Sequence, residues 1–209
     1  MTGQERSIRS AITSSSLPLV LAAGAAALLT SPAPAADGTA AAAKAEPCVA
    51  CHGEGGVSQT EGVPSLAAQP DQYTQWQLVY FRSGTRKNDV MEQVAAPLSD
   101  ADVRELGAYF AKLPAPQPAA SSDAQPELTA KGAQLAPQHQ CNSCHGGTYA
   151  GQQAIARLAG QREDYLLKAL RDFKSGARSG GGVAAMPTTV YDLQDSDLVA
   201  LAHYLARAR

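Results

Sequence analysis

Hydrophobic residues recur every three or four positions in two stretches of the chain, residues 72–82 and 99–113. This spacing puts the apolar side chains on one face of an α-helix. The second stretch opens with Ser99 and Asp102, whose spacing matches a capping box at a helix N-terminus. No segment shows the alternating β-branched pattern of a strand. The sequence therefore predicts an all-α fold.

Both stretches recur in the C-terminal half of the chain. The first returns between Tyr165 and Phe173, and the second returns with leucines at 198, 201 and 205. Gln194 stands where Ser99 does and is a poorer N-cap residue. Three further segments repeat at offsets of 92 to 95 positions: 66–69 as 158–161, 81–86 as 173–178, and 98–102 as 193–197. Offsets this constant indicate two copies of one helical unit.

The sequence outside the two copies predicts a leader and a linker. Arg6 and Arg9 precede a short apolar stretch that ends near Ala-Pro-Ala at 33–35, as in a secretory signal peptide. Regularly spaced prolines between 114 and 118 favour an extended, stiff linker. We therefore expect a signal peptide at 1–35, a first domain at 36–113, a linker at 114–126 and a second domain at 127–209. Export predicts a periplasmic location.

Each copy contains one Cys-x-x-Cys-His motif. Its members are Cys48, Cys51 and His52 in the first copy and Cys141, Cys144 and His145 in the second. Two thiols three residues apart on a helical turn can form thioethers to both vinyl groups of one haem, and the adjacent histidine can bind the iron. Zinc would need both CxxC pairs at one site, and an exported CxxC pair can also form a disulfide. The motif favours two covalent haem c groups over these alternatives.

The composition agrees with a bound apolar group in each copy. Hydrophobic residues make up 44% of the chain but aromatic residues only 5%, and many of the apolar residues are alanines, which bury little surface each. A haem would supply the core that such short units lack. The net charge of −2 gives no basic field for gripping phosphates, so we expect no nucleic-acid partner.

A second axial ligand is predicted at Met91 and Met186. With Met1 in the signal peptide, these are the two remaining methionines, and each lies seven residues before the leucine that precedes the last helix of its copy. A lone methionine is usually a flexible filler of the core. The equivalent placement of these two favours one thioether ligand for each iron.

Two other histidines and two arginines are weaker candidates. His139 lies two residues before a cysteine of the second motif, too close to the proximal side to reach the opposite haem face. His203 lies in the last helix, where we expect a solvated side chain. Neither is expected to bind iron. Arg86 and Arg178 follow Ser-Gly-x in the two copies and are candidates for contact with haem propionates.

The ordered set of motifs, present twice, resembles the dihaem cytochromes c of the c-four type, a tandem of class I cytochrome c domains. The resemblance covers essentially the whole chain after the signal peptide. It implies two domains that face each other about a pseudo-twofold axis with their haems close together. Two positions depart from the family pattern. The proline whose carbonyl can orient the proximal histidine is matched by Pro64 but replaced by Ala156 in the second copy, and Ala68 stands where glycine is usual.

A His/Met iron has no open coordination position, so we expect no small-molecule substrate at the metal and outer-sphere electron transfer rather than catalysis. The resemblance implies a membrane respiratory complex as donor and a terminal haem-copper oxidase as acceptor, and it leaves peripheral membrane association open. One alternative is the cytochrome subunit of a larger dehydrogenase, such as flavocytochrome c sulfide dehydrogenase. Another is a dihaem enzyme of the peroxidase or thiosulfate-oxidising type.

The two copies differ in charge. Residues 36–116 contain six Lys and Arg against ten Asp and Glu, a net charge of −4, whereas residues 117–209 contain nine against eight, a net charge of +1. Negative charge stabilises the oxidised haem, although salt screens surface charges beyond about 8–10 Å. We therefore expect the lower-potential haem in the first domain.

Overall fold

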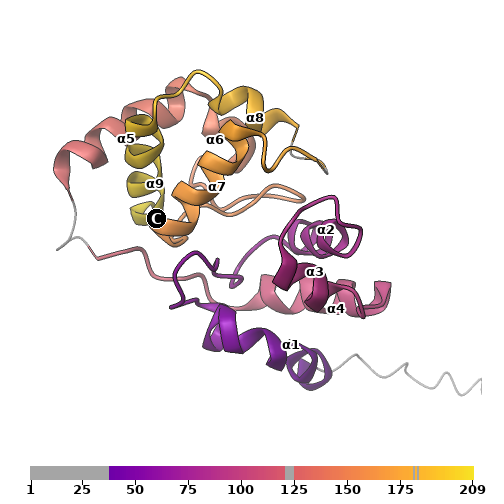
Figure 1. Cartoon of the computed structure of the whole chain (residues 1–209). Helices are drawn as coiled ribbons and strands as arrows, with labels where there is room; N and C mark the ends of the chain where they lie inside the picture. The colour runs from indigo at the N-terminus through magenta and orange to yellow at the C-terminus, as the bar shows by residue number, and fades with distance from the viewer. Residues whose placement is uncertain (1–37, 121–124, 181, 183) are drawn as a thin grey trace, which may run out of the picture. The chain divides into compact units, whose positions relative to one another are not determined.

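The first repeat is built from four α-helices and one short 3₁₀ helix. The computed structural model describes residues 38–120, 125–180, 182 and 184–209. Within this part of the chain, the helices of the first repeat are α1 (Gly38–His52), η1 (Glu54–Gly56), α2 (Asp71–Arg82), α3 (Asp89–Ala95) and α4 (Asp100–Lys112) (Figure 1).

The second repeat has a similar order, with α5 and the separate motif helix α6 in the place of α1, and α7, α8 and α9 in the places of α2, α3 and α4. Its helices are α5 (Pro126–Gln138), α6 (Cys141–His145), α7 (Glu163–Ser175), α8 (Ala185–Val190) and α9 (Asp195–Arg207). The described residues contain no strand, only an isolated bridge between Gln152 and Ile155. The predicted all-α fold is confirmed. The predicted signal peptide at 1–35 lies outside the described residues.

In the described part of the chain, no helix combines the length and the apolar character needed to cross a bilayer.

The final helix of each repeat begins at the predicted cap. In α4, the side chain of Ser99 accepts a hydrogen bond from the N–H of Asp102 at 3.2 Å, and Asp102 accepts one from the N–H of Ser99 at 3.0 Å. At the start of α9, the N–H of Gln194 donates to the carboxylate of Asp197 at 2.9 Å. The N–H of Asp197 donates to the backbone carbonyl of Gln194. Both arrangements satisfy N–H groups that a helix leaves without intrahelical partners.

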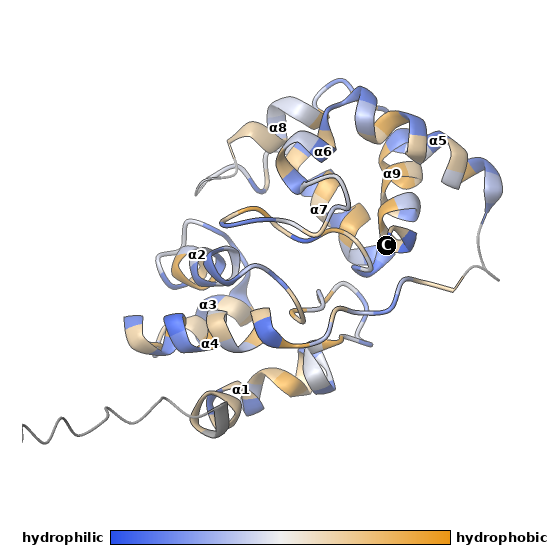
Figure 2. Ribbon diagram, turned by 180° about the vertical axis from the view of Figure 1, so that it is seen from behind, coloured by the Kyte–Doolittle hydropathy of each residue, from blue (hydrophilic) through white to orange (hydrophobic). Residues whose placement is uncertain are grey.

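The larger apolar cluster surrounds α9, which lies beside α5 and α7 (Figure 1). Orange hydrophobic segments run along α7 and α9 in Figure 2. Gly132 in α5 lets the two helices approach closely, because a Cβ there would lie 2.3 Å from the carbonyl oxygen of Ala200. Among the described residues, the corresponding cluster in the first repeat has three fully buried members, Ala45, Leu106 and Phe110, with six partly buried hydrophobic residues packed against them. The apolar cluster of the first repeat is therefore smaller than that of the second.

The expectation that His203 is solvated was wrong. Its side chain is only 1% exposed, because α9 is covered on more than one side and buries His203 as well as its leucine stripe. Its Nε2 accepts a hydrogen bond from the N–H of Gln125 at the start of α5, at 3.1 Å, and its Nδ1 lies 3.2 Å from a carboxylate oxygen of Glu163. Both ring nitrogens are therefore engaged in fastening α5 and α7 to α9.

Ala68 and Gly160 occupy the same backbone conformation in the two repeats. Their φ angles are 54° and 71°, in the left-handed region. Each residue uses its N–H to bond the end of the last helix, Ala68 to the carbonyl of Phe110 at 2.9 Å and Gly160 to that of Leu205 at 3.3 Å. A Cβ is strained in this region, so the alanine noted in the sequence carries a conformational cost that the glycine avoids.

We predict that Ala68→Gly stabilises the first repeat by about 0.5–1 kcal/mol, because relief of the left-handed strain exceeds the entropy that glycine adds to the unfolded chain. Denaturant unfolding of the holoprotein measures the change. The matched control is Gly160→Ala, which should destabilise, since its new Cβ would also lie 2.8 Å from the carbonyl oxygen of Pro116. A loss of stability in Ala68→Gly would contradict the prediction.

Candidate functional site

The two CxxCH motifs lie on helical turns, as the thioether geometry requires. The first motif ends α1, and the second forms the whole of α6. None of the four cysteines of the two motifs forms a disulfide in the described structure; Cys48 and Cys141 are half-buried, and Cys51 and Cys144 are exposed. Burial raises the pKa of the Cys48 and Cys141 thiols. In the described structure, neither motif is closed as a disulfide.

Each motif histidine is buried and bonded to one backbone carbonyl. Nδ1 of His52 lies 2.7 Å from the carbonyl oxygen of Pro64, and Nδ1 of His145 lies 2.8 Å from that of Ala156. A carbonyl only accepts, so Nδ1 carries the proton in both rings. Burial lowers the pKa of each histidine despite the opposing effect of this bond. Each ring is thus a neutral imidazole whose Nε2 lone pair suits a metal.

The departure at Ala156 does not disturb this geometry. The bond to the histidine uses a backbone oxygen, which alanine presents as well as proline does. Proline restricts the backbone around it but adds no acceptor. The two motif histidines are therefore held in equivalent ways in the two repeats.

The two methionines lie on short helices that the sequence analysis did not predict. Met91 is in α3 and Met186 is in α8, and both side chains are half-buried. Asn88 caps α3, its side chain accepting from the N–H of Met91 at 2.9 Å. Asn88 is a typical N-cap residue and is the sequence signal that could have placed this helix. Met186 packs against the same apolar cluster as Cys141.

These residues fit one covalent haem in each repeat. The first cysteine of each motif packs against the apolar cluster of its own repeat, Cys48 against the cluster of Ala45, Leu106 and Phe110 and Cys141 against the cluster around α9. Thiols, a neutral imidazole and a thioether are the donors that c-type haem uses. Among the described residues, no three His, Cys, Asp or Glu side chains are placed to share a metal ion. The zinc alternative therefore has no ligand cluster in that part of the chain.

Arg86 and Arg178 meet around one buried glutamine. Both guanidinium groups donate to Oε1 of Gln77, at 2.7 and 2.9 Å. Each also reaches a tyrosine of the other repeat, Arg86 to Tyr165 at 3.1 Å and Arg178 to Tyr73 at 3.2 Å. Burial opposes ionisation of Tyr165, but the two guanidinium groups outweigh it and lower its pKa to about 8. The sequence singled out the arginines but not these long-range partners, which no local motif marks.

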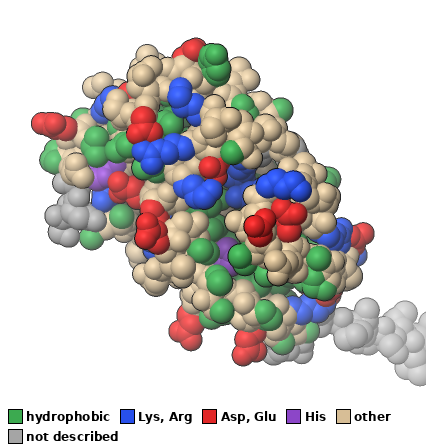
Figure 3. Space-filling view, in the orientation of Figure 1, with side chains coloured by type: hydrophobic (Ala, Val, Ile, Leu, Met, Phe, Trp, Pro, Cys, Tyr) green, Lys and Arg blue, Asp and Glu red, His purple; other side chains and the backbone are tan. Residues whose placement is uncertain are grey.

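Charges of both signs are mixed on the face shown in Figure 3. Apolar side chains also reach the surface of the described chain, among them Trp76 of α2 and Tyr191, which is 71% exposed just after α8. This face therefore offers no large field of one sign for a strongly charged partner.

The family model for cytochrome c matches residues 35–114 and 129–209. The chain is 37% identical over 179 residues to a thiosulfate dehydrogenase electron acceptor from Thiomonas intermedia, covering 82% of each chain. It is 34% identical over 168 residues to cytochrome c4 of Thiocapsa roseopersicina, covering 76% of this chain and 85% of that one.

Among solved structures, the crystal structure of reduced recombinant cytochrome c4 from Pseudomonas stutzeri matches with a TM-score of 0.75 and 29% identity. The match covers 84% of this chain and 100% of that one. Two CxxCH motifs in two such domains imply two covalent haem c groups, and electron transport is the function they serve. The chain belongs to the cytochrome c family, as a dihaem electron carrier of the cytochrome c4 type with two tandem cytochrome c domains.

Proposed function

We propose that two His/Met-ligated haems carry single electrons in this protein. In this proposal the attachment residues are Cys48, Cys51, Cys141 and Cys144, and the axial pairs are His52 with Met91 and His145 with Met186. The observation that carries the proposal is the paired Nδ1 bond at 2.7 and 2.8 Å, because it leaves Nε2 of each buried histidine for the iron. When bound, each haem supplies a one-electron Fe(III)/Fe(II) couple.

The protein's own residues position and shield these groups. The Pro64 and Ala156 carbonyls fix the rings of His52 and His145, and burial of both rings keeps water from competing for Nε2. The thioethers of Met91 and Met186, as ligands of the two irons, would leave no open position for a substrate and would raise the reduction potentials. The chain is then a carrier of electrons and not itself an enzyme.

The proposed route runs in the periplasm, from a membrane respiratory complex to a terminal haem-copper oxidase. A second candidate route, in which a thiosulfate dehydrogenase is the electron donor, is favoured by the similarity to the thiosulfate dehydrogenase electron acceptor from Thiomonas intermedia. Stopped-flow mixing separates the two routes. Rapid reduction of the oxidised protein by a thiosulfate dehydrogenase with thiosulfate supports the second, and rapid oxidation of the reduced protein by oxidase-containing membranes supports the first.

We predict that the mature protein carries two haems that survive unfolding, because thioethers are covalent. Intact mass spectrometry under denaturing conditions should give a chain that begins near Ala36 plus two haem masses. As a control, Cys141→Ser with Cys144→Ser should retain one haem. A mass equal to the polypeptide alone would end the haem assignment.

We predict that Met91→His and Met186→His each alter one haem only. Each substitution should remove half of the weak Met-to-iron absorption at the red edge of the spectrum and lower the potential of that site, since axial ligands move haem potentials over a range of about 0.8 V. His139→Ala is the control and should leave the spectrum unchanged. If either methionine variant keeps the wild-type spectrum and both potentials, that methionine is not a ligand.

We predict that the haem of the first domain has the lower potential, because residues 36–116 carry a net charge of −4 against +1 for residues 117–209. A redox titration of the wild type beside Met91→His assigns the two waves, and the substitution should move the lower one. Movement of the upper wave instead would show that local ligation outweighs the charge difference.

A further inference from the structure

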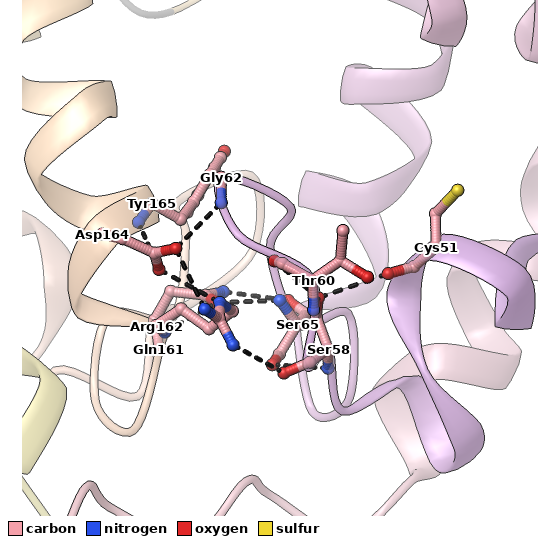
Figure 4. A network of polar contacts seen from close by, with 9 residues as sticks. All are labelled: Cys51, Ser58, Thr60, Gly62, Ser65, Gln161, Arg162, Asp164 and Tyr165. Carbon is pink, nitrogen blue, oxygen red and sulfur yellow. Dashed lines mark hydrogen bonds and ion pairs between the residues drawn. The ribbon is translucent and has the colours of Figure 1, made fainter.

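One buried glutamine of each repeat reaches into the other repeat. Gln69 and Gln161 end the repeated segments 66–69 and 158–161, and each side chain is 4% exposed. The amide of Gln161 pairs with both backbone groups of Ser65, accepting from its N–H at 2.8 Å and donating to its carbonyl at 2.9 Å (Figure 4). The amide of Gln69 pairs with Arg157 in the same way, with both distances 3.0 Å.

The contact of Gln161 continues to the first proximal histidine. The N–H of Ser65 and the carbonyl of Pro64 belong to one peptide group. That N–H donates to Oε1 of Gln161, and that carbonyl accepts from Nδ1 of His52. A side chain of the second repeat is therefore linked to the imidazole of the first through one planar, conjugated amide.

The mirror-image link runs from the first repeat to the second. The N–H of Arg157 and the carbonyl of Ala156 form one peptide group. Its N–H donates to Oε1 of Gln69, and its carbonyl accepts from Nδ1 of His145. In each link, the glutamine of one repeat is connected to the motif histidine of the other repeat.

Such a link acts on the imidazole in a defined direction. Hydrogen bonds in series polarise one another, by roughly 10–30% for each bond, so a peptide whose N–H is bonded has a stronger carbonyl acceptor. A stronger acceptor at Nδ1 makes the imidazole a more basic ligand. A more basic ligand favours Fe(III) and lowers the reduction potential. Both glutamines and Ser65 are buried, which limits screening by water most fully in the link to His52, whereas Arg157 in the other link is half-buried.

We propose that Gln161 and Gln69 are positioning residues that act across the repeats, each lowering the potential of the haem in the other repeat. The proposal rests on the axial roles of His52 and His145 in the proposed function. The glutamines act through the peptide groups at 64–65 and 156–157, whose carbonyls bond the two histidines.

Redox titrations of Gln161→Met and Gln69→Met test the proposal. Methionine has a similar size but no amide to pair with the backbone. Gln161→Met should raise the potential of the first-repeat haem and leave the second unchanged, and Gln69→Met should do the reverse. Each variant controls for the other, because a general loosening between the repeats would move both waves in both variants. Oε1 of Gln161 also accepts from the N–H of Arg162 in its own repeat at 3.0 Å, so a purely local role predicts a shift of the second-repeat haem.

NMR of the reduced protein gives a readout of the hydrogen bond itself. The Nδ1–H signal of His52 should move upfield in Gln161→Met while that of His145 stays in place. Gln161→Glu is the conservative variant. Its acid form keeps a donor and an acceptor, and its carboxylate is the stronger acceptor, so the first haem must stay at or below its wild-type potential. If the methionine variants do not fold, ionisation of this glutamate on raising the pH must lower the first wave more than the second.

A shift of the haem in the glutamine's own repeat, equal shifts of both haems, or no shift overturns the proposal. Failure of the proposed function is visible separately. A wild-type protein without two haem masses or without two redox waves contradicts the axial assignments, whereas their presence leaves only the crossed links under test.

Discussion

The hydrogen bond between each motif histidine and a backbone carbonyl is the contact on which the rest of each repeat depends. It fixes the tautomer of His52 and His145 and requires the chain after each CxxCH to return to the ring. In the segment that returns to the ring, two successive backbone N–H groups donate to one carbonyl oxygen. This oxygen belongs to Gly56 in the first repeat and to Tyr149 in the second. These backbone bonds close the loop, and in the first repeat the N–H of Ser58 adds a bond to the side-chain hydroxyl of Ser65 at 3.1 Å. An added Cβ at Gly53 would lie 2.0 Å from the carbonyl oxygen of Val57, so the loop depends on glycine at this position.

Much of the fold followed from local spacing. The 3.6-residue pattern placed α2, α4, α7 and α9, and the CxxCH motifs marked the proximal residues because the attachment chemistry leaves no freedom of spacing. The helices α3 and α8 were missed because seven and six residues show too little of a period to stand out. The burial of His203 was missed because a stripe of leucines does not reveal that α9 is covered on several sides.

The contacts between repeats could not be predicted for a different reason. In the sequence, Gln69 and Gln161 stand out only as members of a repeated segment. Their spacing does not indicate that the amide of Gln69 pairs with Arg157 and that of Gln161 with Ser65. Such pairing depends on how the two folded repeats pack together, and this packing produces no periodic pattern in the sequence of either repeat. The departure at Ala156 leaves the geometry intact, since the acceptor is main chain.

Two electrostatic influences on the haems thus differ in their range and in their sensitivity to salt. The charge difference between the repeats lies largely on solvated side chains and weakens as ions screen it. The links from the two glutamines begin at buried amides and use neutral groups, so ionic strength hardly alters them. Raising the salt concentration should therefore reduce the part of the potential difference that comes from surface charge and preserve the part that comes from the peptide links. Because each link needs the other repeat, an isolated repeat would lose its link at any ionic strength, and the duplicated unit is not equivalent to two independent cytochromes.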